Sequence, residues 1–198
     1  MKELCFATNN KHKIEEVRSI IEPDFRILSL RDIGCHDELP ETGLTLEANS
    51  LEKAQYVFSK FSIPCFADDS GLEVDTLNGA PGVFSARYAG DHKNDGDNTA
   101  LLLSNLAGKE NRAAQFRTVI SLLEEKGKYI FGGTIKGSII HEKRGNNGFG
   151  YDPVFVPEGY SLTFAEMPSE QKNAISHRAI AVKKLCAFLI RNYISKIH

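Results

Sequence analysis

The chain has 198 residues, of which 41% are hydrophobic and 25% charged, a composition typical of a globular protein with one sizeable core. Its formal net charge of -2 lacks the basic excess of proteins that bind nucleic acid or anionic membranes, so we expect neither partner. Four scattered cysteines without C-x-x-C spacing, and no long apolar segment, predict free thiols in a cytoplasmic protein without a membrane span.

The first predicted element is a strand, because residues 4–7 form a short apolar run. Apolar residues then recur at helical spacing over residues 14–21, so residues 8–13 form a polar loop that opens a helix. The N–H groups and positive dipole end of a helix start favour an anion, and the two lysines of the loop add charge. Helix capping by Asn9 or Asn10, with solvated lysines, is the other interpretation.

A second strand is predicted over residues 25–30, and an exposed, acidic loop follows over residues 31–43. Thr45 is of the residue type that caps helices, so a helix begins there. Glu41 therefore lies just before a helix. It is a candidate metal ligand, although most carboxylates at such a position are solvated.

Residues 67–75 carry four carboxylates and a hydroxyl directly after the apolar run 63–67. This run is typical of a buried strand, whose end would deliver Asp68 and Asp69 to a sheet edge, where open α/β folds place their chemistry. Hard carboxylate oxygens at that position suit Mg²⁺ and phosphate chemistry. A polar turn over residues 68–71 is the alternative, because Asp, Ser and Gly are common turn residues.

The middle of the chain predicts a turn, a loop, a helix and a hairpin. Residues 77–83 are dense in turn formers, residues 91–98 form a polar, mobile loop, and residues 99–106 form a helix. Two longer segments, 113–123 and 129–140, are separated by a short polar stretch and predict a β-hairpin.

The loop over residues 145–153 places three glycines around Phe149 and Tyr151 and leads into a strand over residues 154–156. Glycine lets a backbone approach a ligand closely, and the two aromatic rings offer faces on which a nucleobase stacks. A rigid turn with both rings in the core is the alternative.

Near the C-terminus, a short polar segment over residues 169–175 carries Lys172, and Ser176 caps a last helix. His177 and Arg178 occupy the first turn of this helix, where basic side chains oppose the helix dipole. This position indicates a ligand acceptor or a carboxylate nearby. Pairing of Arg178 with a local glutamate is equally compatible with the sequence.

Together these features are what a protein needs to hold a nucleoside triphosphate with Mg²⁺: a basic loop, carboxylates, a glycine-aromatic loop and a basic helix terminus. The order of six motifs also closely resembles the noncanonical purine nucleoside triphosphate pyrophosphatase (inosine triphosphatase) family. The six motifs occupy residues 8–13, 41–45, 67–72, 81–88, 149–153 and 176–178.

This resemblance implies an α/β fold with a mixed central β-sheet flanked by helices. It implies a single domain over residues 1–198, made of two lobes without a linker and with the active-site cleft between them. The implied activity is hydrolysis of ITP, dITP and XTP to the monophosphate and pyrophosphate, which cleanses the nucleotide pool. The family usually forms homodimers.

The resemblance also assigns roles to individual residues. Asp69 would be the general base and, with Glu41, would hold Mg²⁺. The substrate-binding residues would be Thr8, Asn9, Asn10, Lys11, His12, Lys13, Ser70, Phe149, Gly150, Tyr151, Asp152, Lys172, His177 and Arg178. One departure concerns the metal: members often carry Glu directly before the residue aligned with Asn49, but Ala48 stands here and Glu47 lies one position earlier.

The expected mechanism is in-line attack of water on the α-phosphorus, with Asp69 orienting and deprotonating the water. A 6-oxo purine would accept hydrogen bonds from donors such as Lys172 or Arg178, whereas the amino group of adenine would leave these donors unpaired. Two other functions are compatible with the motifs. One is a phosphatase with an aspartyl nucleophile, and the other is a nucleotide sensor without turnover.

Overall fold

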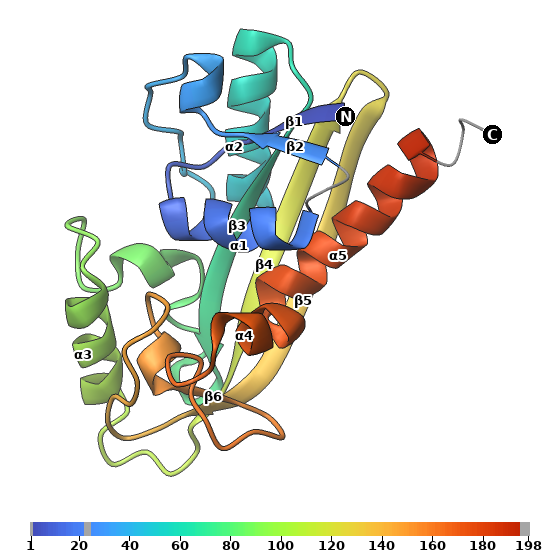
Figure 1. Cartoon of the computed structure of the whole chain (residues 1–198). Coiled ribbons are helices and arrows are strands. Elements are labelled where there is room, and N and C mark those ends of the chain that lie inside the picture. Colours follow the sequence, from blue (N-terminus) through green and yellow to red (C-terminus); the bar gives the residue numbers. More distant parts are fainter. Residues whose placement is uncertain (1, 22–24, 195–198) are drawn as a thin grey trace. The chain divides into compact units, whose positions relative to one another are not determined.

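The computed structural model describes residues 2–21 and 25–194, and within these ranges the strands form one sheet of six (Figure 1). The spatial order of the strands is β2-β1-β3-β4-β5-β6. In chain order, the strands are β1 (Lys2–Phe6), β2 (Phe25–Leu28), β3 (Cys65–Val74), β4 (Ala113–Glu124), β5 (Gly127–Ile139) and β6 (Phe155–Pro157). The α-helices are α1 (Lys11–Ile21), α2 (Leu46–Phe61), α3 (Asp95–Asn105), α4 (Ser169–Ile175) and α5 (His177–Leu189).

The sheet is mixed. Strand β1 pairs in parallel with β2 and with β3, and Cys5 lies opposite both Leu28 and Cys65. Strand β5 pairs antiparallel with β6, where Ser138 lies opposite Val156. The predicted α/β fold with a mixed central sheet and flanking helices is therefore confirmed.

The chain divides into two compact units. The first comprises Met1–Asp69, Thr118–Gly133 and Arg178–His198, and the second comprises Ser70–Arg117 and Thr134–His177. The divisions fall inside β3, β4 and β5, so each of these strands contributes residues to both units.

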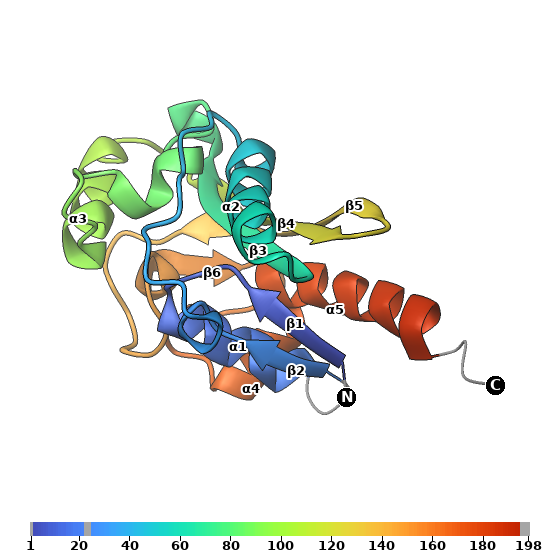
Figure 2. The ribbon, with the colours of Figure 1, turned by 90° about the horizontal axis from the view of Figure 1, so that it is seen from above.

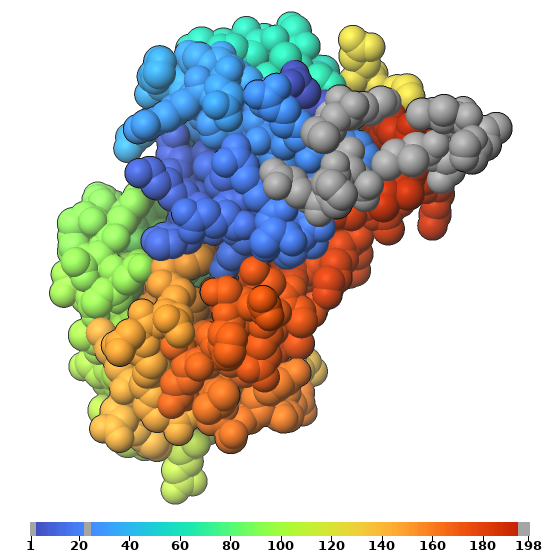
Figure 3. All heavy atoms as spheres, in the orientation of Figure 1, coloured from blue at the N-terminus to red at the C-terminus, as the bar shows by residue number. Residues whose placement is uncertain are grey.

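In the first unit, apolar side chains cover both faces of β1 and β3. Phe6 and Phe66 stack at 4.5 Å on the face covered by α1 and α5, whereas Cys5 and Cys65 lie on the opposite face with residues of α2 (Figure 2). Burial on both faces is typical of parallel strands between helices. Helix α5 has one buried side, and its exposed side shows at the surface in red (Figure 3).

The second unit has a core of its own, built largely from aromatic rings. Phe116 of β4 packs edge-on against Phe155 of β6 at 4.7 Å and lies 6.1 Å from Phe164. Leu102 of helix α3 and Leu106, the residue directly after this helix, are both fully buried. This core supports the loop between β5 and β6.

The cysteines are free thiols, as predicted, and Cys5, Cys35 and Cys65 are buried. Burial raises the pKa of Cys5 and of Cys65 to about 12, so both thiols stay protonated at neutral pH. None of the helices in the part of the chain that the structure describes is long and apolar enough to cross a bilayer.

Most predicted elements are confirmed, including the hairpin and the cap by Thr45, whose side chain accepts a hydrogen bond from Ala48 N. Two predictions were wrong. Strand β3 does not end before the acidic residues but continues through Asp68 and Asp69 to Val74. Helix α3 begins four residues earlier than predicted and takes up half of the supposed mobile loop.

Gly71 is required by its contact with a neighbouring loop, because a Cβ at this position would lie 2.3 Å from Gly82 O. We expect Gly71→Ala to lower the free energy of unfolding by about 1–3 kcal/mol, since a backbone atom has to move. In Gly132→Ala, by contrast, the new Cβ meets only Thr118 O at 3.8 Å, so stability is unchanged or slightly raised. Urea unfolding of both variants measures this, and equal losses would contradict the steric explanation.

Candidate active site

The loop between β1 and α1 is held by its own side chains. Asn10 caps α1, because its Oδ1 accepts a hydrogen bond from Lys13 N at 3.2 Å. Thr8 Oγ1 accepts a hydrogen bond from Asn10 N at 3.2 Å, and Asn9 Nδ2 donates to Asp37 O at 3.4 Å. The capping interpretation therefore holds for Asn10.

A buried ion network lies next to this loop. Asp68 accepts hydrogen bonds from Lys13 Nζ on Oδ1 at 2.9 Å and from Arg178 Nε on Oδ2 at 3.1 Å. Arg178 is 2% exposed and also pairs with Glu16 through Nη1. The basic residue at the start of α5 thus has carboxylates nearby, as predicted, although neither is local in sequence.

The network keeps Asp68 ionised. Burial alone would raise the pKa of Asp68, but the Lys13 ammonium and the Arg178 guanidinium outweigh it and hold this pKa well below its usual range. Because both carboxylate oxygens already accept hydrogen bonds from cations, Asp68 is a poor proton acceptor.

Asp69, the next residue of β3, belongs to a different cluster. Lys53 Nζ lies 2.6 Å from Glu41 Oε1 and 3.8 Å from Asp69 Oδ1. Asn49 Nδ2 donates to Asp69 Oδ2 at 3.1 Å, while its Oδ1 accepts from Gly43 N at 2.7 Å. The two predicted metal ligands, Glu41 and Asp69, therefore face the same ammonium group.

Burial raises the pKa of Asp69 above that of an ordinary aspartate, and the charges of Lys53 and Lys13 only partly offset this effect. Burial opposes the charged form of Lys53, but Asp69 and Glu41 outweigh it and raise its pKa. Asp69 is thus the more basic of the two adjacent aspartates.

The chemistry of this donor set fits Mg²⁺. Magnesium in nucleotide enzymes takes one or two carboxylates and completes its shell with water and substrate phosphates. Glu41 and Asp69 supply two hard oxygens that converge on one cationic group. Among the described residues, no three His, Cys, Asp or Glu side chains form a group that could hold a metal.

In the second unit, Asp152 organises the glycine-aromatic loop. Its Oδ2 accepts hydrogen bonds from Phe149 N at 2.9 Å and from Lys172 Nζ at 2.7 Å. The same Nζ lies 4.9 Å from the centre of the Phe149 ring. Gly148, at φ +75°, has no room for a side chain, because an added Cβ would lie 2.1 Å from Asp152 Oδ2.

The two aromatic residues of this loop have different environments. Tyr151 is 4% exposed and its hydroxyl donates to Ser85 O at 2.8 Å, so its ring belongs to the core. Phe149 is half-buried and carries Lys172 over one face. The rigid-turn interpretation therefore applies to Tyr151, and the Phe149 ring is the stacking candidate.

The remaining predicted site residues range from buried to exposed. His177 is buried and stacks on Phe116 with ring centres 4.6 Å apart. Lys11 and His12 are exposed at the start of α1, and Ser70 is half-buried in β3.

Sequence reasoning missed three residues of the first unit: Glu16, Asn49 and Lys53. Glu16 pairs with Arg178, and the other two contact Asp69. The sequence pattern could have indicated Lys53, because this residue falls on the apolar side of α2 next to Ala54. In the structure it is 5% exposed. A lysine on such a face needs a carboxylate partner.

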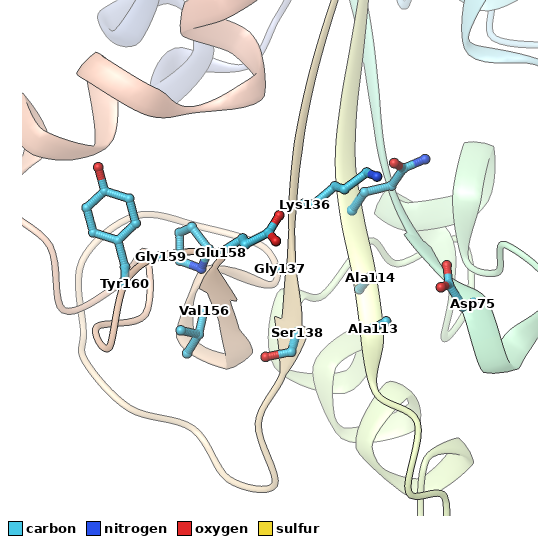
Figure 4. Close-up of a pocket in the computed structure, with 12 residues that line it drawn as sticks. Asp75, Ala113, Ala114, Lys136, Gly137, Ser138, Val156, Glu158, Gly159 and Tyr160 are labelled. Atoms are coloured by element: carbon cyan, nitrogen blue, oxygen red, sulfur yellow. The ribbon is translucent and has the colours of Figure 1, made fainter.

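A pocket of about 630 Å³ lies elsewhere in the second unit (Figure 4). Small residues of β4 and β5, including Ala113 and Gly137, form its floor, and Lys136, Glu158 and Tyr160 lie around it. None of the predicted site residues lines this pocket.

Comparison with known proteins identifies the family. A model of the Ham1 family matches residues 4–188. The chain belongs to the Ham1 family. It is 54% identical over 186 residues to a dITP/XTP pyrophosphatase of Flavobacterium psychrophilum, covering 94% of this chain and 98% of the relative. It is 53% identical over 191 residues to a dITP/XTP pyrophosphatase of Porphyromonas gingivalis, covering 96% and 98%.

Among solved structures, the Staphylococcus aureus Ham1 protein matches with a TM-score of 0.88 and 41% identity. The match covers 96% of this chain and 100% of that structure. These matches confirm the fold and the family that the six sequence motifs predicted.

We expect Asp68→Asn to lower the free energy of unfolding by about 3–5 kcal/mol, because Arg178 and Lys13 lose the partner that compensates their burial. The pKa of Asp68 is lower in the folded protein than in the unfolded chain, where it is near 3.9, so ionised Asp68 stabilises the fold. This stabilisation is complete above the unfolded pKa and is lost as the pH falls through the folded pKa. The variant should therefore show a shallower loss of stability in acid, measured by urea unfolding between neutral pH and pH 3.

Asp37→Asn is the matched control, because Asp37 forms an ion pair with the half-exposed Lys60. Exposed pairs contribute little, so this variant should keep nearly the full stability. An equal loss in both variants would show that the burial of Asp68 is not the cause.

Proposed function

We propose that this chain hydrolyses noncanonical purine nucleoside triphosphates, namely ITP, dITP and XTP, to the nucleoside monophosphate and pyrophosphate. The observation that carries this proposal is the Asp69 cluster, where a buried carboxylate of raised pKa faces Glu41 and Lys53. The names of the Flavobacterium and Porphyromonas relatives agree with this activity. Such an enzyme is a hydrolase that removes damaged nucleotides from the pool.

The loop before α1 is proposed to bind the triphosphate, through Thr8, Asn9, Asn10, Lys11, His12 and Lys13. It presents the N-terminus of an 11-residue helix, which favours phosphate groups. Lys11 is exposed and can turn toward a phosphate, whereas Lys13 is engaged by Asp68.

The residues proposed to bind the nucleoside end are Phe149, Gly150, Tyr151, Asp152, Lys172, His177 and Arg178, and Ser70 is proposed to lie beside the substrate. Lys172 is a pure donor held beside the Phe149 ring by Asp152. A 6-oxo purine stacked there offers it an acceptor, and the 6-amino group of adenine does not. Because the Tyr151 ring is in the core, Tyr151 would act through its main chain.

Glu41 and Asp69 are proposed to hold Mg²⁺. When bound, the ion would neutralise negative charge on the phosphates. Lys53 would then share these carboxylates with the ion or turn to the substrate.

Asp69 is the proposed general base. Asn49 fixes its Oδ2, and burial makes it a stronger base than an ordinary aspartate. It would orient a water molecule in line with the α-phosphorus and accept its proton, while lysines of the α1 loop offset the charge of the leaving pyrophosphate.

The proposal also includes a cytoplasmic location and a homodimer. The nucleotide pool that such an enzyme cleanses is cytoplasmic. The homodimer rests on the family resemblance alone.

The expected products are diagnostic. With Mg²⁺, the protein should release pyrophosphate from ITP, dITP and XTP and leave ATP almost intact, because adenine lacks the 6-oxo acceptor. A coupled pyrophosphate assay over a panel of triphosphates measures this. Orthophosphate as the first product, or a trapped acyl-phosphate on an aspartate, would contradict the proposed reaction.

Asp69→Asn should lower kcat for ITP by about 10²–10⁴-fold, because the amide cannot accept the proton of the attacking water. Asp75→Asn is the control, since Asp75 follows the same strand but is exposed. This control should keep normal turnover. Normal turnover in Asp69→Asn would remove the assignment of the base.

A further inference from the structure

The main chain of Gly150 is held by helix α3. Gly150 N donates a hydrogen bond to Asp95 Oδ2 at 2.7 Å, across 55 residues of sequence. Thr99 Oγ1, one turn further along the same helix, lies 3.4 Å from Gly150 O. Both backbone polar atoms of Gly150 thus face the first two turns of α3.

The bond to Asp95 complements the one made by Asp152. Two successive N–H groups of the loop, those of Phe149 and Gly150, each donate to a carboxylate. Asp152 lies within the loop, whereas Asp95 comes from another element. Gly150 has φ +62°, a left-handed conformation that glycine adopts without steric cost.

Helix α3 can act as a rigid support. The buried side chain of Asn98 accepts a hydrogen bond from Ala89 N and donates one to Ala86 O. Thr99 is also buried, and its hydroxyl donates to Asp95 O at 2.7 Å. The backbone that carries Asp95 is therefore anchored on its inner side, although the Asp95 side chain is at the surface.

We propose that Asp95 is a positioning residue for nucleotide binding, which fixes the peptide between Phe149 and Gly150 and thereby the orientation of the Phe149 ring. This inference rests on the proposed function, in which that ring and Lys172 receive the purine base. Asp95 contacts no substrate. It acts on the affinity for the nucleotide and leaves the attack on phosphorus to the Asp69 cluster.

A carboxylate in the first turn of a helix also has a simple structural effect, because it favours the positive end of the helix dipole. Asp97 lies in the same turn and shares this effect, but its side chain pairs with His92 instead of the loop. Comparing variants of the two aspartates therefore distinguishes an effect on the loop from an effect on helix stability.

The test compares Asp95→Ala, Asp95→Asn and Asp97→Ala by steady-state kinetics with ITP and Mg²⁺. Loss of a hydrogen bond to a charged group should raise KM about tenfold or more in Asp95→Ala, with kcat changed by less than about twofold. Asparagine keeps an acceptor oxygen, so Asp95→Asn should recover most of the affinity. Asp97→Ala should behave as the wild type in both constants.

Two further measurements make the outcome decisive. Hydrogen exchange should show faster exchange at the Gly150 amide in Asp95→Ala and not in Asp97→Ala. Equilibrium binding of inosine monophosphate should weaken in the same variant. An unchanged KM, an equal change in Asp97→Ala, or a fall in kcat alone would overturn the role of Asp95. Failure of the wild type to release pyrophosphate would instead contradict the proposed function.

Discussion

The carboxylate of Asp68 ties together three segments that are far apart in the sequence. It lies in β3 and receives Lys13 from α1 and Arg178 from α5, and Glu16 balances the second cation. A buried charge without partners costs several kcal/mol, so β3 can carry this aspartate into the interior only when both helices are in place. The loop before α1 and the start of α5 are positioned by the same interaction.

The two adjacent aspartates of β3 show how environment divides the roles of identical side chains. Neighbouring residues of a strand point to opposite faces, so Asp68 and Asp69 meet different partners. Cations hold the pKa of Asp68 low, whereas burial raises the pKa of Asp69. Pairs whose pKa values are pushed apart in this way are typical of catalytic sites.

The second unit repeats the same physical solution in its glycine-aromatic loop. Asp152 is 3% exposed and fixes Lys172, as Asp68 fixes Lys13 and Arg178. In each unit a buried carboxylate orients a basic side chain. These charged groups lose their contact with water when the chain folds. The basic groups are therefore already ordered when the substrate binds.

The sequence by itself determined most of the helices and strands, because their apolar periodicity and the cap at Thr45 are local properties. It also determined the family, through the order of six motifs. It did not predict that residues 169–175 form a helix. Only the tertiary structure decided that β3 continues through Asp68, that Lys53 is buried between Glu41 and Asp69, and that Tyr151 belongs to the core. The burial of a charged or polar group depends on partners that lie far away in the sequence, and local patterns do not contain that information.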